Sequence, residues 1–160
     1  MQMAKGIKGF RGEMLSVSRD PHRHPDAVRY EPDGLFIVED GLIVARGDYA
    51  SLAPSYPGIP IDHLPGLVVP GFIDAHVHYA QMDHIASHGE QLLDWLDRHI
   101  FPAEKAFADR AHAASLANLF LDELLRNGTT SALVFPTVHA HSVDALFDAA
   151  LDRNMRILSG

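Results

Sequence analysis

The chain has 160 residues, 47% of them hydrophobic, so it is long enough to bury a core of ordinary domain size. It has 13 Lys and Arg residues against 21 Asp and Glu residues, a formal net charge of −8. With no basic cluster, this balance argues against nucleic-acid binding through phosphate contacts. The lack of cysteine excludes disulfides and thiolate metal sites. Without an apolar run of membrane-spanning length or a signal-like N-terminus, we expect a cytoplasmic protein with no membrane partner.

The first third of the sequence is typical of β-structure. Residues 10–18 predict a strand, and two apolar runs within 35–45 predict a hairpin, because Asp40-Gly41 between them favours a two-residue turn. Four prolines within residues 54–65 then indicate an extended loop. We therefore expect residues 1–66 to form a small β-domain that resembles a sandwich.

From residue 67 onward the hydrophobic pattern alternates between strands and helices. Asp109 and Ser142 predict the N-caps of two helices, and Asn127-Gly128 predicts the end of the first. A capping-box spacing at residues 87–90 favours a short helix, which we expect Pro102 to separate from the next helix. The expected order is a strand ending at residue 78, a short helix through 92–96, a helix after 109, a strand over 129–135, a helix from 142 to about 153, and a strand from 156.

This alternation places the second part of the chain in the α/β class. It implies parallel strands joined by right-handed crossovers. A complete (β/α)8 TIM barrel needs about 250 residues, and its chemistry lies at the C-terminal ends of the strands. We therefore expect residues 67–160 to form the first strands and helices of an incomplete barrel, with His76 and His78 at the end of its first strand.

His76 and His78 are the strongest candidates for a functional site. Side chains two residues apart on a strand point to the same face, so both imidazoles can bind one metal ion. The alternative is a pair of hydrogen-bonded strand histidines without a metal. Asp74 precedes them on the same strand and should share their face, and we expect it to orient backbone or a neighbouring histidine rather than to bind metal.

Several motifs carry a family resemblance. The strand Pro70-Gly71-Phe72-Ile73-Asp74-Ala75 followed by the two histidines resembles the first barrel strand of the amidohydrolase superfamily. Within that superfamily, residues 34–160 resemble the guanine deaminases. The elements that carry this closer resemblance are His76-Val77-His78-Tyr79-Ala80-Gln81, Gly89-Glu90-Gln91-Leu92-Leu93-Asp94-Trp95-Leu96, Phe101-Pro102-Ala103-Glu104, Asn127-Gly128-Thr129-Thr130 and Phe135-Pro136-Thr137-Val138-His139.

The resemblance implies hydrolysis of guanine to xanthine and ammonia at one zinc ion, with iron as an alternative metal. It implies that His76 and His78 bind the metal and that Gln81 hydrogen-bonds the purine edge. It also implies that Trp95 and Leu96 line the substrate pocket, and that the intact protein is a homodimer. The family's proton-shuttling glutamate and its late aspartate have no counterpart here, so we expect them beyond Gly160. The chain is therefore expected to be an N-terminal fragment without catalytic residues of its own and with little or no activity alone.

Two other functions remain open at this point. The chain could belong to another amidohydrolase that acts on a different purine or on a triazine, although Gln81 and Trp95 argue against it. It could also be a non-catalytic remnant that binds metal or a full-length subunit. Among the other histidines, the second His-x-His pair, His139 and His141, precedes a helix, where we expect His139 near the substrate mouth rather than on a metal. His22 and His24 lie in a polar loop, where solvation is the expected state.

Overall fold

The computed structural model describes residues 6–87, 89 and 91–160, and divides into two compact units. The first unit ends at Pro70 and the second begins at Gly71. The sequence placed this boundary between residues 66 and 67. The structural division falls later because the strand Ile61–Val68 continues through both positions and pairs within the first unit.

The first unit is built on one four-stranded sheet. β2 pairs antiparallel with β1 and with β3, whereas β4 lies parallel to β1 at the sheet edge. The described residues form a single sheet here, where a sandwich-like arrangement was expected. The strands, in spatial order, are β3 (Leu42–Asp48), β2 (Val28–Glu39), β1 (Ile7–Val17) and β4 (Ile61–Val68), with short helical turns at η1 (Pro25–Ala27), α1 (Tyr49–Leu52) and η2 (Ala53–Ser55).

Two local predictions for this unit had different outcomes. The hairpin is confirmed: β2 and β3 are joined at Asp40 and Gly41, whose φ angles of 49° and 84° are those of a type I′ turn. The extended loop over residues 54–65 is wrong in its second half, because β4 begins at Ile61. β4 contains Pro65, which an edge strand tolerates because one side of its backbone needs no ladder hydrogen bond.

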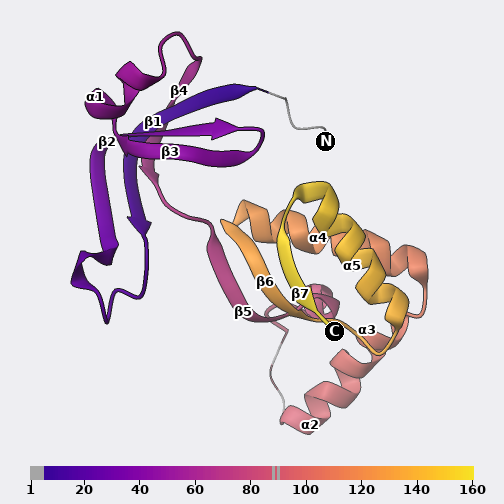
Figure 1. The fold of residues 1–160 in the computed structure, drawn as a ribbon. Helices are drawn as coiled ribbons and strands as arrows, with labels where there is room; N and C mark the ends of the chain where they lie inside the picture. Colours follow the sequence, from indigo (N-terminus) through magenta and orange to yellow (C-terminus); the bar gives the residue numbers. More distant parts are fainter. Residues whose placement is uncertain (1–5, 88, 90) are drawn as a thin grey trace. The chain divides into compact units, whose positions relative to one another are not determined.

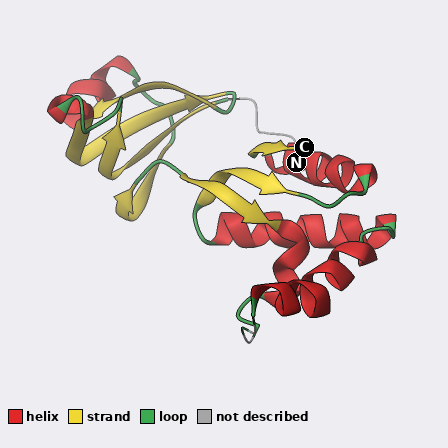
Figure 2. Ribbon diagram, turned by 90° about the horizontal axis from the view of Figure 1, so that it is seen from below, coloured by secondary structure: helices red, strands yellow, loops and turns green. Residues whose placement is uncertain are grey.

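The second unit has the expected strand–helix alternation. Its three strands are parallel and lie in the order β5-β6-β7, with the helices α4 and α5 packed on one face (Figures 1 and 2). In chain order the elements are β5 (Phe72–His78), η3 (Tyr79–His84), α2 (Leu92–Trp95), η4 (Leu96–Ile100), α3 (Phe101–Ala106), α4 (Arg110–Arg126), β6 (Thr129–Phe135), α5 (Ala140–Arg153) and β7 (Arg156–Ser159).

A buried cluster joins the helices to this sheet. Ala132 and Val134 of β6 pack against residues of α4 and α5, and Tyr79 and Phe107 close the cluster near the C-terminal end of β5. The strand predictions for residues 129–135 and from 156 are confirmed. None of the described helices combines the length and hydrophobicity that a bilayer span requires.

The predicted end signals are confirmed for α4, but the predicted N-cap of α5 is wrong. Asp109 caps α4 by accepting hydrogen bonds from the backbone amides of Ala111 and His112, and Gly128 follows the C-cap with a φ of 83°, as predicted. Ser142 is not the N-cap of α5. The helix begins two residues earlier at Ala140, and the Ser142 side chain is buried against Thr137, at 3.0 Å between the hydroxyl oxygens.

The short helix lies where it was predicted, but the signals proposed for its start and end are wrong. α2 begins at Leu92 with Gln91 at its N-cap, so the capping box at residues 87–90 is wrong in position; residues 88 and 90 lie outside the described part of the chain. Pro102 does not separate helices, because α2, η4 and α3 run on with helical backbone at each junction. The intervening turn η4 is a π-helix, and Pro102 sits in the first turn of α3, where its missing amide is tolerated.

Candidate metal and substrate site

A register irregularity in β5 places the two histidines on one face of the sheet. Val77 pairs with Val134 and His78 with Phe135, whereas Asp74 pairs with Ala132. β5 therefore advances three residues where β6 advances two, which is a β-bulge. Because paired residues of neighbouring strands share a face, His78 lies with Phe135 on the face opposite the buried Val134, and His76 lies two residues along on the same face.

The two imidazoles converge at their ring nitrogens. The Nε2 atoms of His76 and His78 lie 3.2 Å apart. Two nitrogen ligands of a tetrahedral zinc ion, each about 2.0–2.1 Å from the metal, lie about 3.3 Å apart, so the pair fits a shared metal ion. The same distance suits a hydrogen bond between two neutral rings, one Nε2 donating and the other accepting. The geometry thus accommodates both of the alternatives that the sequence left open.

The surroundings of His78 favour its neutral, metal-binding form. Burial lowers the pKa of the His78 imidazole below its ordinary value, and the nearby His76 lowers it further, whereas the Glu104 carboxylate opposes the shift. A histidine must be neutral to bind a metal, so the lowered pKa keeps His78 competent at more acidic pH. Glu104 belongs to the Phe-Pro-Ala-Glu element noted in the sequence.

Asp74 supports the backbone of the histidine pair. Its Oδ1 accepts a hydrogen bond from the backbone amide of His76, 3.0 Å away, as expected from the sequence. The bulge places Asp74 on the opposite face of the sheet from the two histidines. Asp74 pairs with the buried Ala132 rather than with a residue of the open face. The sequence expectation that all three side chains share a face is therefore wrong at Asp74.

One cavity of about 380 Å³ brings most of the predicted site residues together. His76, His78, Gln81 and Trp95 line it, whereas Leu96, the residue after Trp95, is half-buried and is not part of the lining. The remaining lining residues are Val77, Met82, His84, Ile85 and Phe120. The sequence analysis gave His84 no role at this site, although its position six residues after His78 could have suggested the cavity.

Trp95 is oriented by a specific contact. Its indole Nε1 donates a hydrogen bond to the Ser87 hydroxyl, 3.0 Å away, and the side chain is half-buried. With its only polar atom engaged by Ser87, the indole ring can present apolar surface to the cavity. Ser87 was predicted to cap the helix that contains Trp95. Its hydroxyl instead accepts a hydrogen bond from the Trp95 side chain of that helix.

Other histidines make contacts of their own. His139 is the N-cap residue of α5, and the His141 ring nitrogen lies 2.7 Å from the Phe107 carbonyl oxygen. Their rings stack 5.7 Å apart, while His84 and His99 form a tilted ring pair at 5.8 Å. Across the described residues, no group of three or more His, Cys, Asp or Glu side chains is arranged to hold a metal ion.

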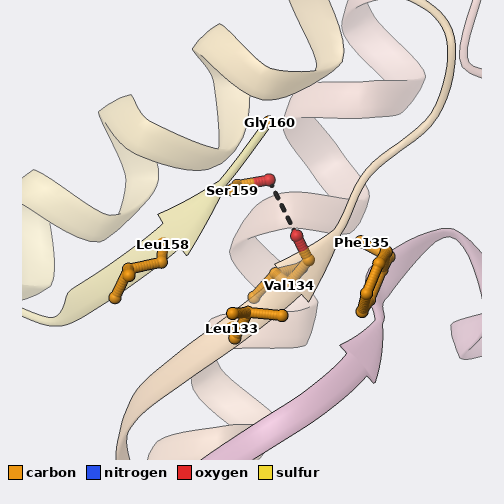
Figure 3. A pocket seen from close by; sticks show the side chains of 6 residues that line it. All are labelled: Leu133, Val134, Phe135, Leu158, Ser159 and Gly160. Carbon is orange, nitrogen blue, oxygen red and sulfur yellow. Dashed lines mark hydrogen bonds between the residues drawn. The ribbon is translucent and has the colours of Figure 1, made fainter.

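The C-terminal ends of β6 and β7 border a second hollow of about 250 Å³ (Figure 3). Within it the Ser159 hydroxyl donates a hydrogen bond to the Val134 carbonyl oxygen at 2.9 Å. Phe135 lies on the side of β6 that faces β5, and the sequence had suggested no role for it. The complete lining is Leu133, Val134, Phe135, Leu158, Ser159 and Gly160.

The family follows from comparison with known proteins. The model of the amidohydrolase family matches residues 67–160, more than half of the chain. The chain therefore belongs to the amidohydrolase family. The match covers the whole second unit, including the strand that ends in His76 and His78.

More specific similarities point to guanine deaminases. The chain is 42% identical over 159 residues to guanine deaminase from Escherichia coli (strain K12), covering 96% of this chain and 36% of that protein. It matches the crystal structure of guanine deaminase from Bradyrhizobium japonicum with a TM-score of 0.91 and 39% identity, covering 96% of this chain and 34% of that one. A third match is the crystal structure of guanine deaminase from C. acetobutylicum with bound guanine in the active site. Its TM-score is 0.81 at 26% identity, and the match covers 97% of this chain and 36% of that one. The chain thus spans about a third of the length of these relatives.

Proposed function

We propose that this chain supplies the first half of a metal site and part of the substrate pocket of a guanine deaminase. The reaction is guanine plus water to xanthine plus ammonia. The observation that carries the proposal is the convergence of His76 and His78 beside Gln81 and Trp95 in one cavity. Similarity to guanine deaminases from three organisms supports guanine as the substrate.

The donor set fits a zinc ion, with iron as the alternative. Neutral imidazoles are common ligands of both metals, and the Nε2 separation of 3.2 Å is close to that required of two ligands on one zinc. When bound, such a metal supplies a hydroxide at neutral pH by lowering the pKa of its water. Catalytic zinc sites usually have three protein ligands, so the proposed site needs at least one ligand besides His76 and His78.

The purine would be held by groups that line the same cavity. Gln81 offers both an amide donor and a carbonyl acceptor, which suits the mixed donor and acceptor edge of guanine. The Trp95 ring provides an apolar wall whose N–H is already engaged by Ser87. We also propose that the half-buried Leu96, which directly follows Trp95, borders this wall, although it does not line the cavity itself. We also propose a homodimeric, cytoplasmic enzyme, which sedimentation and cell fractionation would test.

The test is a chimera in which this chain replaces the matching segment of the E. coli guanine deaminase. We expect it to release ammonia from guanine and to bind one zinc per subunit. His76→Asn and His78→Asn should each bring ammonia release to background and lower the zinc content. The matched control is His22→Asn/His24→Asn, a double change in the His-x-His of the polar loop. It should leave the rate of ammonia release and the zinc content within about twofold of those of the unchanged chimera.

The other outcomes separate the alternatives. Ammonia release from adenine or from a triazine, but not from guanine, would assign the chain to another amidohydrolase. A folded, zinc-loaded chimera without activity on any of these substrates would contradict the deaminase proposal. Unchanged zinc content in both histidine variants would contradict the assignment of His76 and His78 as metal ligands. The substrate would then be assigned from the ammonia-release measurements alone.

A further inference from the structure

Phe135 contacts both candidate metal ligands at once. It is the last residue of β6 and pairs with His78 in the parallel register of β5 and β6. Its ring centroid lies 4.9 Å from that of His78, with the planes only 17° apart, and 4.6 Å from that of His76 at an interplanar angle of 38°. These distances are typical of packed aromatic pairs, so one phenyl ring forms a surface against which both imidazoles lie.

The placement of Phe135 follows from the bulge in β5. A regular ladder from Asp74 and Ala132 onward would pair His76 with the buried Val134 and turn it toward the helices. The extra residue brings His78 into register with Phe135 instead, and leaves His76 beside the same ring. The bulge therefore selects the face, and the phenyl ring limits the orientations that each imidazole can take on that face.

Ring orientation matters because the two Nε2 atoms must aim at one point. Their separation of 3.2 Å depends on the χ1 and χ2 angles of two partly exposed side chains on an open sheet face. Groups that hold metal-binding histidines in place typically change metal affinity by about 10–100-fold when they are removed. A hydrogen bond is the usual means, and a stacked ring restricts the same rotations by packing.

We infer that Phe135 is a positioning residue that holds His76 and His78 in the geometry for one shared metal ion. It acts through the imidazoles and is not itself a ligand. A planar side chain is required at this position, because a branched aliphatic side chain fills similar volume without offering a flat surface to both rings. The inference rests on the proposed metal site.

The test measures zinc affinity of the purified 160-residue chain by competition with a chromophoric chelator. Phe135→Leu should weaken zinc binding by about tenfold. Phe135→Tyr keeps the ring and should stay within about twofold of the original chain. Leu133→Ala is the matched control: Leu133 is two residues earlier on the same face of β6, with 40% of its surface exposed, and its side chain has no ring to stack on an imidazole (Figure 3). Circular dichroism confirms that each variant is folded.

A metal-free measurement keeps this inference separate from the proposed function. In the chelator-treated chain, nuclear Overhauser effects should connect the Phe135 ring protons to ring protons of both His76 and His78. Absence of those effects in the folded chain would overturn the positioning role, even if Phe135→Leu did not fold. Equal zinc affinity of Phe135→Leu and the original chain would also overturn it. If His76→Asn/His78→Asn left zinc affinity unchanged, the metal site would fail, and with it the role of Phe135 in metal binding.

Discussion

Single residues in the second unit act through contacts that their chemical type alone does not reveal. His76, His78 and Phe135 form one aromatic cluster, and each is placed by the register of its strand. Ser87 looked like a helix cap, yet its hydroxyl accepts a hydrogen bond from Trp95. At this scale the chemistry of a side chain limits what it can do, and the backbone position decides which of those possibilities is realised.

The first prediction concerns the pKa of His78. Because His76 lowers this pKa and Glu104 raises it, His76→Asn should raise the His78 pKa toward its ordinary value, and Glu104→Gln should lower it further. NMR titration of the imidazole protons in the zinc-free chain measures both changes, with His22→Asn as a control that should have no effect.

The sign of the associated stability change follows from the lowered pKa. The folded state disfavours protonated His78, so the unfolding free energy should fall as the pH drops from about 6.5 through the folded-state pKa. In His76→Asn this fall should be smaller, because one cause of the lowered pKa is gone. An equal or larger acid dependence in that variant would contradict the electrostatic explanation.

The second prediction concerns Gly71, the first residue of the second unit. A Cβ atom added there would lie 2.7 Å from the Cβ of Thr130, well inside the about 3.5 Å at which carbon atoms attract. Gly71→Ala should therefore lower the unfolding free energy by about 1–3 kcal/mol, measured by denaturant titration. Gly47→Ala, where an added Cβ meets nothing within 4 Å, is the control and should change it by less than about 0.5 kcal/mol.

At the scale of elements, a buried tyrosine ties the end of β5 to the start of α5. The Tyr79 hydroxyl donates a hydrogen bond to the Ser142 carbonyl oxygen at 2.7 Å, and the Tyr79 ring packs edge-on against Phe107 at 5.0 Å. Burial raises the pKa of Tyr79, which keeps the hydroxyl protonated and able to donate. Because Tyr79 follows His78 directly, this contact also fixes the chain immediately after the candidate metal site.

The third prediction tests that connection. Tyr79→Phe removes one buried hydrogen bond, so the unfolding free energy should fall by about 0.5–1.5 kcal/mol. Tyr30→Phe is the control, because Tyr30 is 56% exposed and should change the stability by less than about 0.5 kcal/mol. Equal effects of the two substitutions in thermal or chemical denaturation would show that the hydrogen bond contributes little.

At the scale of the whole molecule, the sheet of the second unit has one covered and one open face. The helices cover the face of Ala132 and Val134, whereas the opposite face exposes apolar side chains. Leu133 and Leu158 are paired on that face, and Ile73 lies on it through its pairing with Ser131. Contiguous exposed apolar surface of this kind binds apolar dyes and promotes association.

The fourth prediction follows from this open face. The chain should bind the dye ANS and associate at micromolar concentration. Ile73→Thr/Leu158→Thr, which changes side chains that are 77% and 56% exposed, should lower both the dye fluorescence and the association. Leu93→Thr/Val138→Thr removes comparably exposed side chains outside the sheet and should have a smaller effect. Equal effects of the two pairs, measured by fluorescence and sedimentation, would contradict a role of the sheet face.

Local signals in the sequence predicted the elements whose causes are themselves local. The Asp40-Gly41 turn, the Asp109 cap and the strand over residues 129–135 were confirmed, because turn geometry, capping and β-branched runs act within a few residues. Pro102 and Ser142 were misread, since the same residues are also tolerated in a first helical turn and in a buried contact. The boundaries of α5 and β4 differ from those predicted, because contacts with distant parts of the chain help to set them.

Periodicity and motifs of adjacent residues were enough to establish the α/β class of the second unit, the pairing of His76 with His78 and the family resemblance. The folded chain was needed to show which face the histidines occupy, that Asp74 is out of phase with them, and that Phe135 stacks on both. The physical reason is the register between β5 and β6. Hydrogen bonds between strands far apart in sequence set that register, and a one-residue bulge reverses the face of every side chain beyond it.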